Sequence, residues 1–392
     1  MPRRTTPGDA KQIQQPTHQS RARSGRSERF RTIVVGGGAA GLVMGYYLRR
    51  AGEPFLIVEA DPRVGDTWRR HYDSLRLFSR PRYASLPGLR IGTRDCPTAA
   101  EMADYLERYA DHFDLPVRAG EQVTRLTCHG DAFTLRTDRR EYLADRVVVA
   151  AGAHRRPIIP AIATTLDPQV RQLHSLEYRR PDQLAAGEVL VIGAGNSGTD
   201  IALEAAATGH RTWLAGRHPG QIPVELDSPA GRIGTPVMMF MFKHVFTQRT
   251  PMGRAMRDRD RDHGEPLVRN KLAHLDAAGI NRVGRIVEVR DGRPVTDDGL
   301  VLDVATVVWC TGSRPDHGWL DLPVFDDAGR PRQDRGVSTD VPGLCFLGLE
   351  FQFAAASGTI QGLDRDARYL LRRLRTQADV GNVTPVPLRR AA

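Results

Sequence analysis

A glycine-rich loop that lies between a short apolar strand and an amphipathic helix occurs twice in this chain. The first copy is Gly36–Gly41, and the second copy, Gly193–Gly198, begins 157 residues later. In each copy the first glycine permits a tight turn, the second lets the backbone approach a pyrophosphate, and the third lets helix and strand pack closely. The free N–H groups of the helix N-terminus then face the phosphates. The sequence therefore predicts an α/β protein with two Rossmann-like dinucleotide-binding domains.

The residue that follows the next strand distinguishes the two sites. The strand 55–58 ends in Glu59, whose carboxylate accepts both hydroxyls of an adenosine ribose and repels a 2′-phosphate, which favours FAD or NAD over NADP. The strand 212–215 is followed by Arg217, whose guanidinium can grip a 2′-phosphate, and this favours NADPH. A surface arginine without a ligand is the alternative. One FAD-like and one NADPH-like site together predict hydride transfer from nicotinamide to flavin.

The order of the remaining strands predicts how the chain divides. Two strands that run into a glycine, 145–152 and 305–312, are expected to return the chain between the domains. We therefore expect an FAD domain split into 31–155 and 313–380, with an NADPH domain inserted at 185–312. The proline-containing stretch 156–184 is expected to be a linker. The strand 343–348 and a helix over 363–374 are expected to return to the flavin.

The ends of the chain and its cysteines bound the remaining expectations. Residues 1–30 carry a net charge of +5, half of the chain's +10, and are expected to be a disordered basic tail. Because half of the positive charge lies in this tail, the net charge of the whole chain is weak evidence for nucleic-acid binding, which is not expected. Residues 381–392 are expected to form a tail at the other end. The sequence has no transmembrane run, no signal peptide and no C-x-x-C or metal-ligand spacing, which favours a cytoplasmic protein without a metal. The oligomeric state cannot be predicted.

The stretch 218–265 has no simple periodicity and is rich in Met and Phe. Three roles are open for it. Core packing ranks first, a substrate tunnel second, and a membrane-touching patch third.

Several further segments resemble those of class B flavin-dependent monooxygenases. This class includes flavin-containing monooxygenases, plant YUCCA-type enzymes and the bacterial CzcO-like group, and the resemblance extends from residue 31 to 378. The matching segments are 64–68, 72–78, 85–88, 195–202 and 362–369. The family's hallmark F-x-G-x-x-x-H-x-x-x-[YFW] survives only in its second half, His174–Tyr178, because Pro168 and Val170 replace its Phe and Gly. For His174 a structural and a functional role are both open.

The resemblance implies where the cofactors bind. Trp68 and the segment from Arg76 to Phe78 would lie near the flavin, and Asn196, the candidate catalytic residue, would contact the nicotinamide nucleotide. The residues expected to contact the cofactors are Gly36, Gly38, Ala39, Ala40, Gly41, Glu59, Trp68, Arg76, Leu77, Val123, Ala151, Gly152, Gly193, Gly195, Asn196, Ser197, Gly198, Arg217, His218, Thr311, Gly312, Gly348 and Gln361.

The same resemblance implies a reaction. NADPH would reduce FAD, the reduced flavin would form a C4a-(hydro)peroxide with O₂, and one oxygen atom would enter a small organic substrate. Two alternatives stay open. One is an NADPH:acceptor flavin reductase without a dithiol, and the other is a sensing or partner-binding protein that keeps FAD as a structural group.

Overall fold

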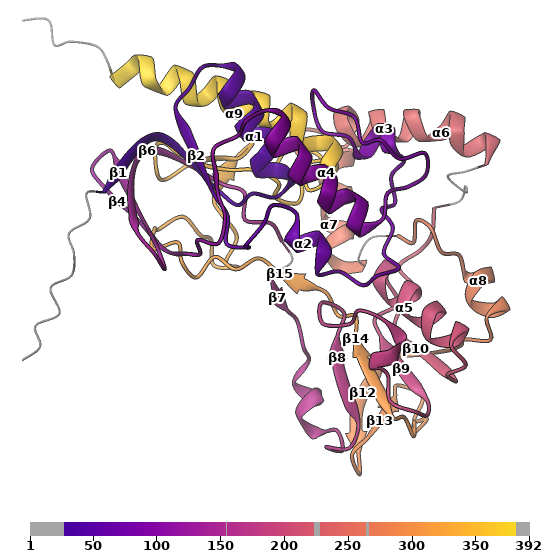
Figure 1. Cartoon of the computed structure of the whole chain (residues 1–392). Helices are drawn as coiled ribbons and strands as arrows, with labels where there is room; N and C mark the ends of the chain where they lie inside the picture. The colour runs from indigo at the N-terminus through magenta and orange to yellow at the C-terminus, as the bar shows by residue number, and fades with distance from the viewer. Residues whose placement is uncertain (1–26, 154, 223–227, 264–265, 382–392) are drawn as a thin grey trace, which may run out of the picture.

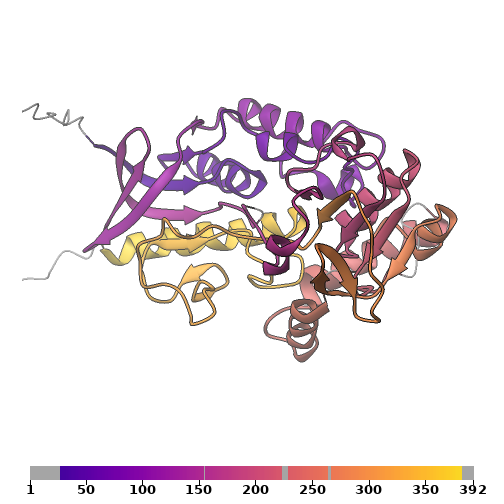
Figure 2. The ribbon, with the colours of Figure 1, turned by 90° about the horizontal axis from the view of Figure 1, so that it is seen from below.

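Two lobes make up the computed structural model of the chain (Figure 1). It describes residues 27–153, 155–222, 228–263 and 266–381. The two predicted basic or terminal tails fall almost wholly outside these ranges. Figure 2 shows the lobes side by side, with helix α9 running along the first lobe.

The first lobe is built on a mixed nine-stranded sheet with a parallel centre. Its main path has the order β16-β17-β18-β6-β1-β2-β3, and the hairpin β4–β5 continues from β6. β18, β6, β1, β2 and β3 pair in parallel, whereas β4, β5, β16 and β17 pair antiparallel. The strands are β1 (Glu28–Val35), β2 (Phe55–Val58), β3 (Val117–Arg118), β4 (Val123–His129), β5 (Ala132–Thr137), β6 (Glu141–Val149), β16 (Gln333–Asp334), β17 (Val337–Ser338) and β18 (Leu344–Phe346).

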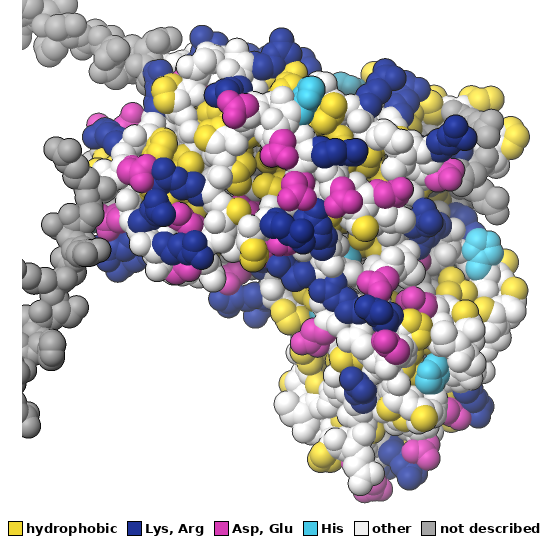
Figure 3. Space-filling view, in the orientation of Figure 1, with side chains coloured by type: hydrophobic (Ala, Val, Ile, Leu, Met, Phe, Trp, Pro, Cys, Tyr) yellow, Lys and Arg dark blue, Asp and Glu magenta, His cyan; other side chains and the backbone are white. Residues whose placement is uncertain are grey.

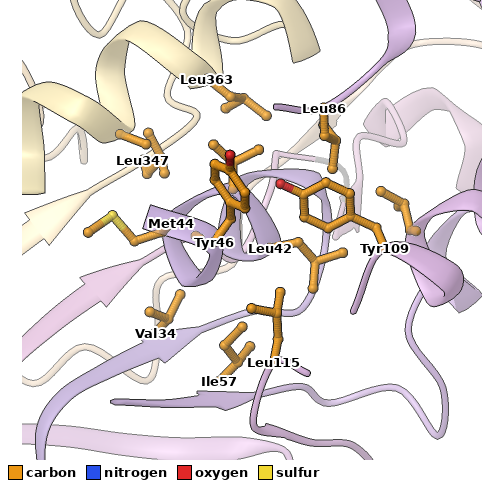
Figure 4. Packing of buried hydrophobic residues seen from close by; sticks show 14 of the residues in the cluster. Val34, Leu42, Met44, Tyr46, Ile57, Leu86, Tyr109, Leu115, Leu347 and Leu363 are labelled. Atoms are coloured by element: carbon orange, nitrogen blue, oxygen red, sulfur yellow. The ribbon is translucent and has the colours of Figure 1, made fainter. Parts of the chain in front are cut away.

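Side-chain alternation along these strands gives the sheet two buried faces. Val34, Ile57 and Val148 point to one face, where they pack against helices α1 (Ala39–Arg50), α4 (Ala99–His112) and α9 (Ile360–Gly381). Figure 4 shows this packing around Leu42, Met44 and Tyr46 of α1. Ile33 and Val147 point to the other face, which the β4–β5 hairpin and residues 319–325 cover. Because both faces are covered, the central strands read as continuous apolar runs.

The second lobe has a five-stranded, all-parallel sheet in the order β11-β10-β9-β14-β8. One face packs against α5 (Asn196–Ala207) and α8 (Leu272–Ala277), and the hairpin β12–β13 covers part of the other. The strands are β8 (Arg171–His174), β9 (Val189–Ile192), β10 (Thr212–Ala215), β11 (Asn281–Val283), β12 (Ile286–Arg290), β13 (Arg293–Thr296) and β14 (Thr306–Trp309). Each lobe thus has the parallel strand–helix order of a Rossmann fold, which confirms the predicted fold class.

The chain crosses between the lobes on two adjacent short strands. β7 (Arg156–Pro157) leads into the second lobe, β15 (Ser313–Arg314) leads back, and the two pair antiparallel (Figure 1). The second sheet also reaches into the stretch that we expected to be a linker, because β8 pairs with β14 along residues 171–174. Two short 3₁₀ helices, Ala161–Thr165 and Pro181–Gln183, complete this stretch.

The prediction that the disordered N-terminal tail extends to residue 30 was wrong for residues 28–30. Residues 28–30 already belong to β1 and pair with β6. Their charges, which resembled those of a solvated tail, have partners far along the chain: Arg118 binds Glu28 at 2.6 Å and Arg29 binds Asp145 at 2.6 Å. Residues 1–26 lie outside the described residues.

The Met- and Phe-rich stretch forms helices at the edge of the interlobe region. These are α6 (Pro229–Phe240), a π-helix η3 (Met241–Val245) and α7 (Pro251–His263). Core packing, the preferred interpretation of this stretch, was wrong for α6, because Ile233, Val237 and Phe240 are 77%, 62% and 59% exposed. Yellow side chains at the free end of α6 mark this surface in Figure 3. The remaining helices are α2 (Asp66–Arg69) and α3 (Pro81–Ala84).

Candidate functional site: a cavity between two phosphate loops

A cavity of about 1210 Å³ lies between the lobes and is lined by parts of both glycine loops. It is larger than the ~300–1,000 Å³ of a typical small-molecule pocket. Of the predicted cofactor residues, those that line it are Gly36, Gly38, Ala39, Ala40, Glu59, Trp68, Arg76, Leu77, Val123, Ala151, Gly152, Gly195, Asn196, Ser197, Gly198, Gly312, Gly348 and Gln361. Gly41, Gly193, Arg217, His218 and Thr311 do not line it.

The first loop is shaped by close backbone contacts that exclude any side chain at two glycines. Gly36 has φ +107°, and a Cβ there would lie 2.4 Å from the Ala150 carbonyl oxygen. A Cβ on Gly41 would lie 1.8 Å from the Gly36 carbonyl oxygen. Gly38, in contrast, faces open space and caps α1 without a side-chain hydrogen bond. The first-turn N–H groups of α1 are therefore open to an anion, and this cradle fits a pyrophosphate.

The second loop repeats this geometry around α5. Gly193 has φ +114° with its virtual Cβ 2.2 Å from the Cys310 carbonyl oxygen, and a Cβ on Gly198 would lie 1.8 Å from the Gly193 carbonyl oxygen. Gly195 faces open space and caps α5 without a side-chain hydrogen bond. Two loops of the same shape, at the carboxyl ends of two parallel sheets, thus line one cavity.

Glu59 lies at the end of β2 beside the first loop. Its Oε1 accepts the Asp61 N–H at 2.8 Å, and its Oε2 accepts the Gly37 N–H. Burial raises the pKa of the Glu59 carboxyl above its ordinary value, and the two backbone N–H donors oppose that rise. A buried acceptor in this place fits the ribose hydroxyls of an adenosine nucleotide.

Arg217 and His218 follow β10 at the corresponding place in the second lobe. Arg217 is exposed and has no ion pair among the described residues. His218 Nδ1 accepts the Gly220 N–H at 3.0 Å, while its buried Nε2 has no hydrogen-bond partner within the described chain. Because Nδ1 accepts the Gly220 N–H, Nε2 carries the ring proton, and burial lowers the pKa of the His218 imidazole below its ordinary value. A free cation and an unmatched donor side by side fit a 2′-phosphate.

The Asn196 side chain is engaged with the backbone of the second lobe. Its Nδ2 donates to the Pro266 carbonyl at 3.2 Å, and its Oδ1 accepts the Val268 N–H at 3.0 Å. The residue lines the cavity, but its amide here holds the 266–268 segment. Its catalytic role stays a prediction.

Residues that were predicted to lie near the flavin line this cavity together. Trp68 of α2, Leu77 and Gly348 line the cavity together with Gln361 in the first turn of α9. Gln361 Oε1 is buried and has no partner among the residues that the structure describes. An orphaned acceptor at this position fits a ligand N–H. Met238 and Met239 of α6 and Phe242 of η3 also line the cavity, and the Phe242 carbonyl accepts the Ala356 N–H of the first lobe at 3.2 Å.

A buried polar network between the lobes was missed by the sequence analysis. Asp200 of α5 accepts from Tyr72 at 2.8 Å, from Asn270 at 2.5 Å and from Arg269 at 2.8 Å. Tyr72 comes from the first lobe but is 2% exposed within the hydrophobic core of the second. Burial raises the pKa of the Tyr72 hydroxyl, as does the Asp200 charge. Trp68 lies on α2, shortly before Tyr72. The network therefore fixes the segment that follows α2 to α5, the helix that follows the second glycine loop.

Arg179 strengthens the same junction. The Arg179 guanidinium donates to the carbonyls of Arg69 and His71, both at 2.9 Å. The backbone carbonyl of Arg179 accepts the Asp73 N–H at 2.9 Å. Tyr178 beside it donates to Glu204 of α5 at 3.0 Å. The only sequence signal for this network was the pair of segments 72–78 and 195–202, which the family resemblance singled out but did not connect.

His174, in the surviving half of the linker motif, has a structural role in this conformation. It is 1% exposed, its Nδ1 accepts the Leu176 N–H at 3.2 Å, and its Nε2 contacts the Gly312 carbonyl at 3.0 Å. Since a carbonyl oxygen can only accept, Nε2 is the donor to Gly312, and burial lowers the pKa of the imidazole below its ordinary value. His174 thus ties the end of β8 to the crossing that returns to the first lobe.

Among the described residues, none of the helices is both long enough and apolar enough to cross a bilayer.

Comparisons with known proteins place this architecture in a family. The family model for pyridine nucleotide-disulphide oxidoreductases matches residues 33–229. An uncharacterised CzcO-like oxidoreductase of Geobacillus kaustophilus is 35% identical over 343 residues, which cover 86% of this chain and 96% of that protein. A flavin-containing monooxygenase from Stenotrophomonas maltophilia superposes with a TM-score of 0.74 at 27% identity, covering 90% of this chain and 99% of the other.

A more distant structure shares the fold alone. OTEMO, solved in complex with FAD and NADP, superposes with a TM-score of 0.62 at 17% identity, covering 91% of this chain and 87% of the other. With two loops of the same shape on one cavity, and with relatives similar over nearly their whole length, the family is established. The chain belongs to the class B flavin-dependent monooxygenases, in the group of CzcO-like oxidoreductases.

Proposed function

We propose that this enzyme uses NADPH to reduce a bound FAD and then inserts one oxygen atom of O₂ into a small organic substrate. The observation that carries the proposal is the pair of equivalent phosphate loops that open onto one cavity, one beside Glu59 and the other beside Arg217. FAD would occupy the lobe of 28–155 and 313–381, and NADPH the lobe of 156–312. The reducing cytoplasm is the proposed compartment, since Cys96, Cys128, Cys310 and Cys345 form no disulfide.

The residues of this chain would divide the work as follows. The first turns of α1 and α5 bind the two pyrophosphates, Glu59 binds the FAD ribose, and Arg217 with His218 Nε2 binds the 2′-phosphate. Gln361 accepts a hydrogen bond from the flavin ring. When bound, the flavin supplies hydride acceptance and oxygen activation. Met238, Met239 and Phe242 line the cavity with apolar side chains and would exclude water from it.

Arg217 gives the sharpest test of the nicotinamide half of the proposal. In Arg217→Ser, we expect NADPH to bind about 10- to 100-fold more weakly, because a charge-assisted hydrogen bond contributes about 1.5–3 kcal/mol. NADH lacks the 2′-phosphate and should bind equally to both proteins. The measurement is the rate of flavin reduction in anaerobic rapid mixing, as a function of nucleotide concentration.

Arg211→Ser is the matched control for this test. Arg211 is an exposed arginine just before β10, where it pairs with Glu188 at 3.1 Å, and its removal should change neither nucleotide's affinity. An equal loss of NADPH and NADH affinity in Arg217→Ser, or no loss at all, would refute the assignment of Arg217. A holoenzyme whose flavin neither nucleotide reduces would refute the proposed function.

A further inference from the structure

A second cavity, of about 1350 Å³, lies on the outer side of the first lobe. Its walls come from α1, from α3 with the following segment 85–91, from η3 and from the first turns of α9. These elements are distant in sequence but meet beside the large interlobe cavity. Neither glycine loop contributes to the walls, and of the residues assigned to the two nucleotides only Gln361 lines this cavity.

The charges that line this second cavity are unbalanced. Five cations, Arg50, Arg82, Arg90, Lys243 and Arg368, face a single acid, Asp364. Asp364 is already bound by Arg368 at 3.0 Å and by the Tyr47 hydroxyl. The other four cations have no carboxylate partner in the described part of the chain. Figure 3 shows Lys and Arg side chains near α3 at the upper edge of this lobe.

Lys243 is the least expected of these cations. It is one of three lysines in a chain that otherwise uses arginine, and it lies half-buried on the π-helix η3. Burial lowers the pKa of its ammonium group below the ordinary value, and the Asp364 charge opposes that shift. A half-buried cation without an ion pair is costly to maintain, and π-helical turns occur frequently at functional sites.

The walls also offer flat apolar surface. The rings of Tyr46, Tyr47 and Tyr83 line the cavity together with Leu86 and Ile360. Arg50 lies over the Tyr46 ring at 5.6 Å and Arg82 over the Tyr83 ring at 5.5 Å. Aromatic rings beside unpaired cations suit a ligand that combines a planar or apolar body with an anionic group.

This cavity adjoins the predicted flavin site. Tyr83, Ile360 and Gln361 line both cavities, and the consecutive residues Phe242 and Lys243 of η3 line the interlobe cavity and the second cavity respectively. The buried, unpartnered Oε1 of Gln361 lies in this shared wall. A ligand held here by its anionic end is therefore next to the residues that would contact the flavin ring.

We propose that the second cavity binds the substrate by an anionic group, and that the substrate is an organic acid with an aromatic or flat apolar body. Lys243 and Arg82 would bind the carboxylate or sulfonate, and the tyrosines would bind the body. That the bound molecule is the substrate rests on the proposed function. The binding of an organic anion in this cavity does not depend on it.

The test uses two dyes that differ only in one anionic sulfonate group. 8-Anilinonaphthalene-1-sulfonate is an aromatic anion, and N-phenyl-1-naphthylamine is the same molecule without the sulfonate. Binding is measured by equilibrium dialysis on FAD-loaded enzyme saturated with NADP⁺, so that both nucleotide sites are filled. For Lys243→Met and for Arg82→Met, we expect the sulfonate to bind about tenfold more weakly and the neutral dye to change less than twofold, because each variant loses one charge-assisted contact.

Arg49→Met is the matched control. Arg49 precedes Arg50 on α1, pairs with Asp114 and does not line the cavity. Its substitution by Met removes the same net charge as Lys243→Met. It should leave both dyes unchanged. An equal loss of the two dyes in Lys243→Met, or an equal loss of the sulfonate in Arg49→Met, would overturn the proposal.

A second readout separates this proposal from the proposed function. The bound sulfonate should shift the visible absorption band of the oxidised flavin in the wild type and not in Lys243→Met at the same concentration. Charge-dependent binding without any flavin shift would overturn a substrate role for the cavity. Neither readout needs turnover, so an enzyme that NADPH fails to reduce would refute the proposed function and leave the anion site standing.

Discussion

Gly41→Ala is expected to bind FAD about 10- to 100-fold more weakly than the wild type. The new Cβ would lie 1.8 Å from the Gly36 carbonyl oxygen, so either α1 must move away from β1 or the turn must open. Overpacking of this kind costs about 1–3 kcal/mol or more, and it falls on the N–H groups that bind the pyrophosphate. The measurement is FAD affinity by titration of the apoprotein.

Gly198→Ala makes the complementary change in the second loop. Its Cβ would meet the Gly193 carbonyl oxygen at the same 1.8 Å, so this variant should retain FAD but lose reduction by NADPH to a similar extent. Gly92→Ala is the control, because Gly92 is exposed and a Cβ there meets nothing within 4 Å. Full FAD binding by Gly41→Ala, or loss of FAD by Gly198→Ala, would contradict the assignment of the two loops.

Asp200→Ala is expected to lower the free energy of unfolding by about 3–5 kcal/mol. The substitution leaves the Tyr72 hydroxyl, the Asn270 amide and the Arg269 guanidinium without their shared acceptor inside the lobe junction. Tyr72→Phe removes only one hydrogen bond and should cost about 1 kcal/mol. The measurement is urea denaturation followed by circular dichroism and by flavin fluorescence.

Asp182→Ala provides the surface comparison for this prediction. Asp182 is 70% exposed and lies 3.9 Å from Arg180, a pair expected to contribute about 0–1 kcal/mol. We also expect Asp200→Ala to slow flavin reduction by NADPH, because Trp68 and the second loop lose their common anchor. A loss of stability no larger than that of Asp182→Ala would show that the network does not hold the lobes together.

The parts of the fold that were predictable from sequence depend on local constraints. Gly41 and Gly198 are required by contacts with the Gly36 and Gly193 carbonyl oxygens, within one strand–turn–helix unit, so the spacing of the glycines identifies both loops. The apolar runs of β1, β6 and β14 are buried on both faces and read directly as parallel strands. The predicted monooxygenase activity came from the resemblance of segments such as 195–202 and 362–369 to class B flavin-dependent monooxygenases.

The parts that were not predictable depend on contacts between distant residues. The prediction ended the tail at residue 30, because the partners of Glu28 and Arg29 lie 90 and 116 residues away. β8 is a four-residue edge strand in which only His174 is buried, so it carries no periodic signal. Tyr72 and Asp200 are 128 residues apart, and neither residue type suggests the other.

The most direct test of the account is the reaction of the reduced enzyme with O₂. The holoenzyme is reduced anaerobically with one equivalent of NADPH and rapidly mixed with oxygenated buffer, with no substrate present, while the visible flavin spectrum is recorded. We predict a delayed return of oxidised flavin, and a shorter delay when the flavin has been reduced with dithionite in the absence of NADP⁺. An immediate return that is independent of NADP⁺, with hydrogen peroxide released in proportion to NADPH, would contradict a monooxygenase and indicate a reductase or an oxidase.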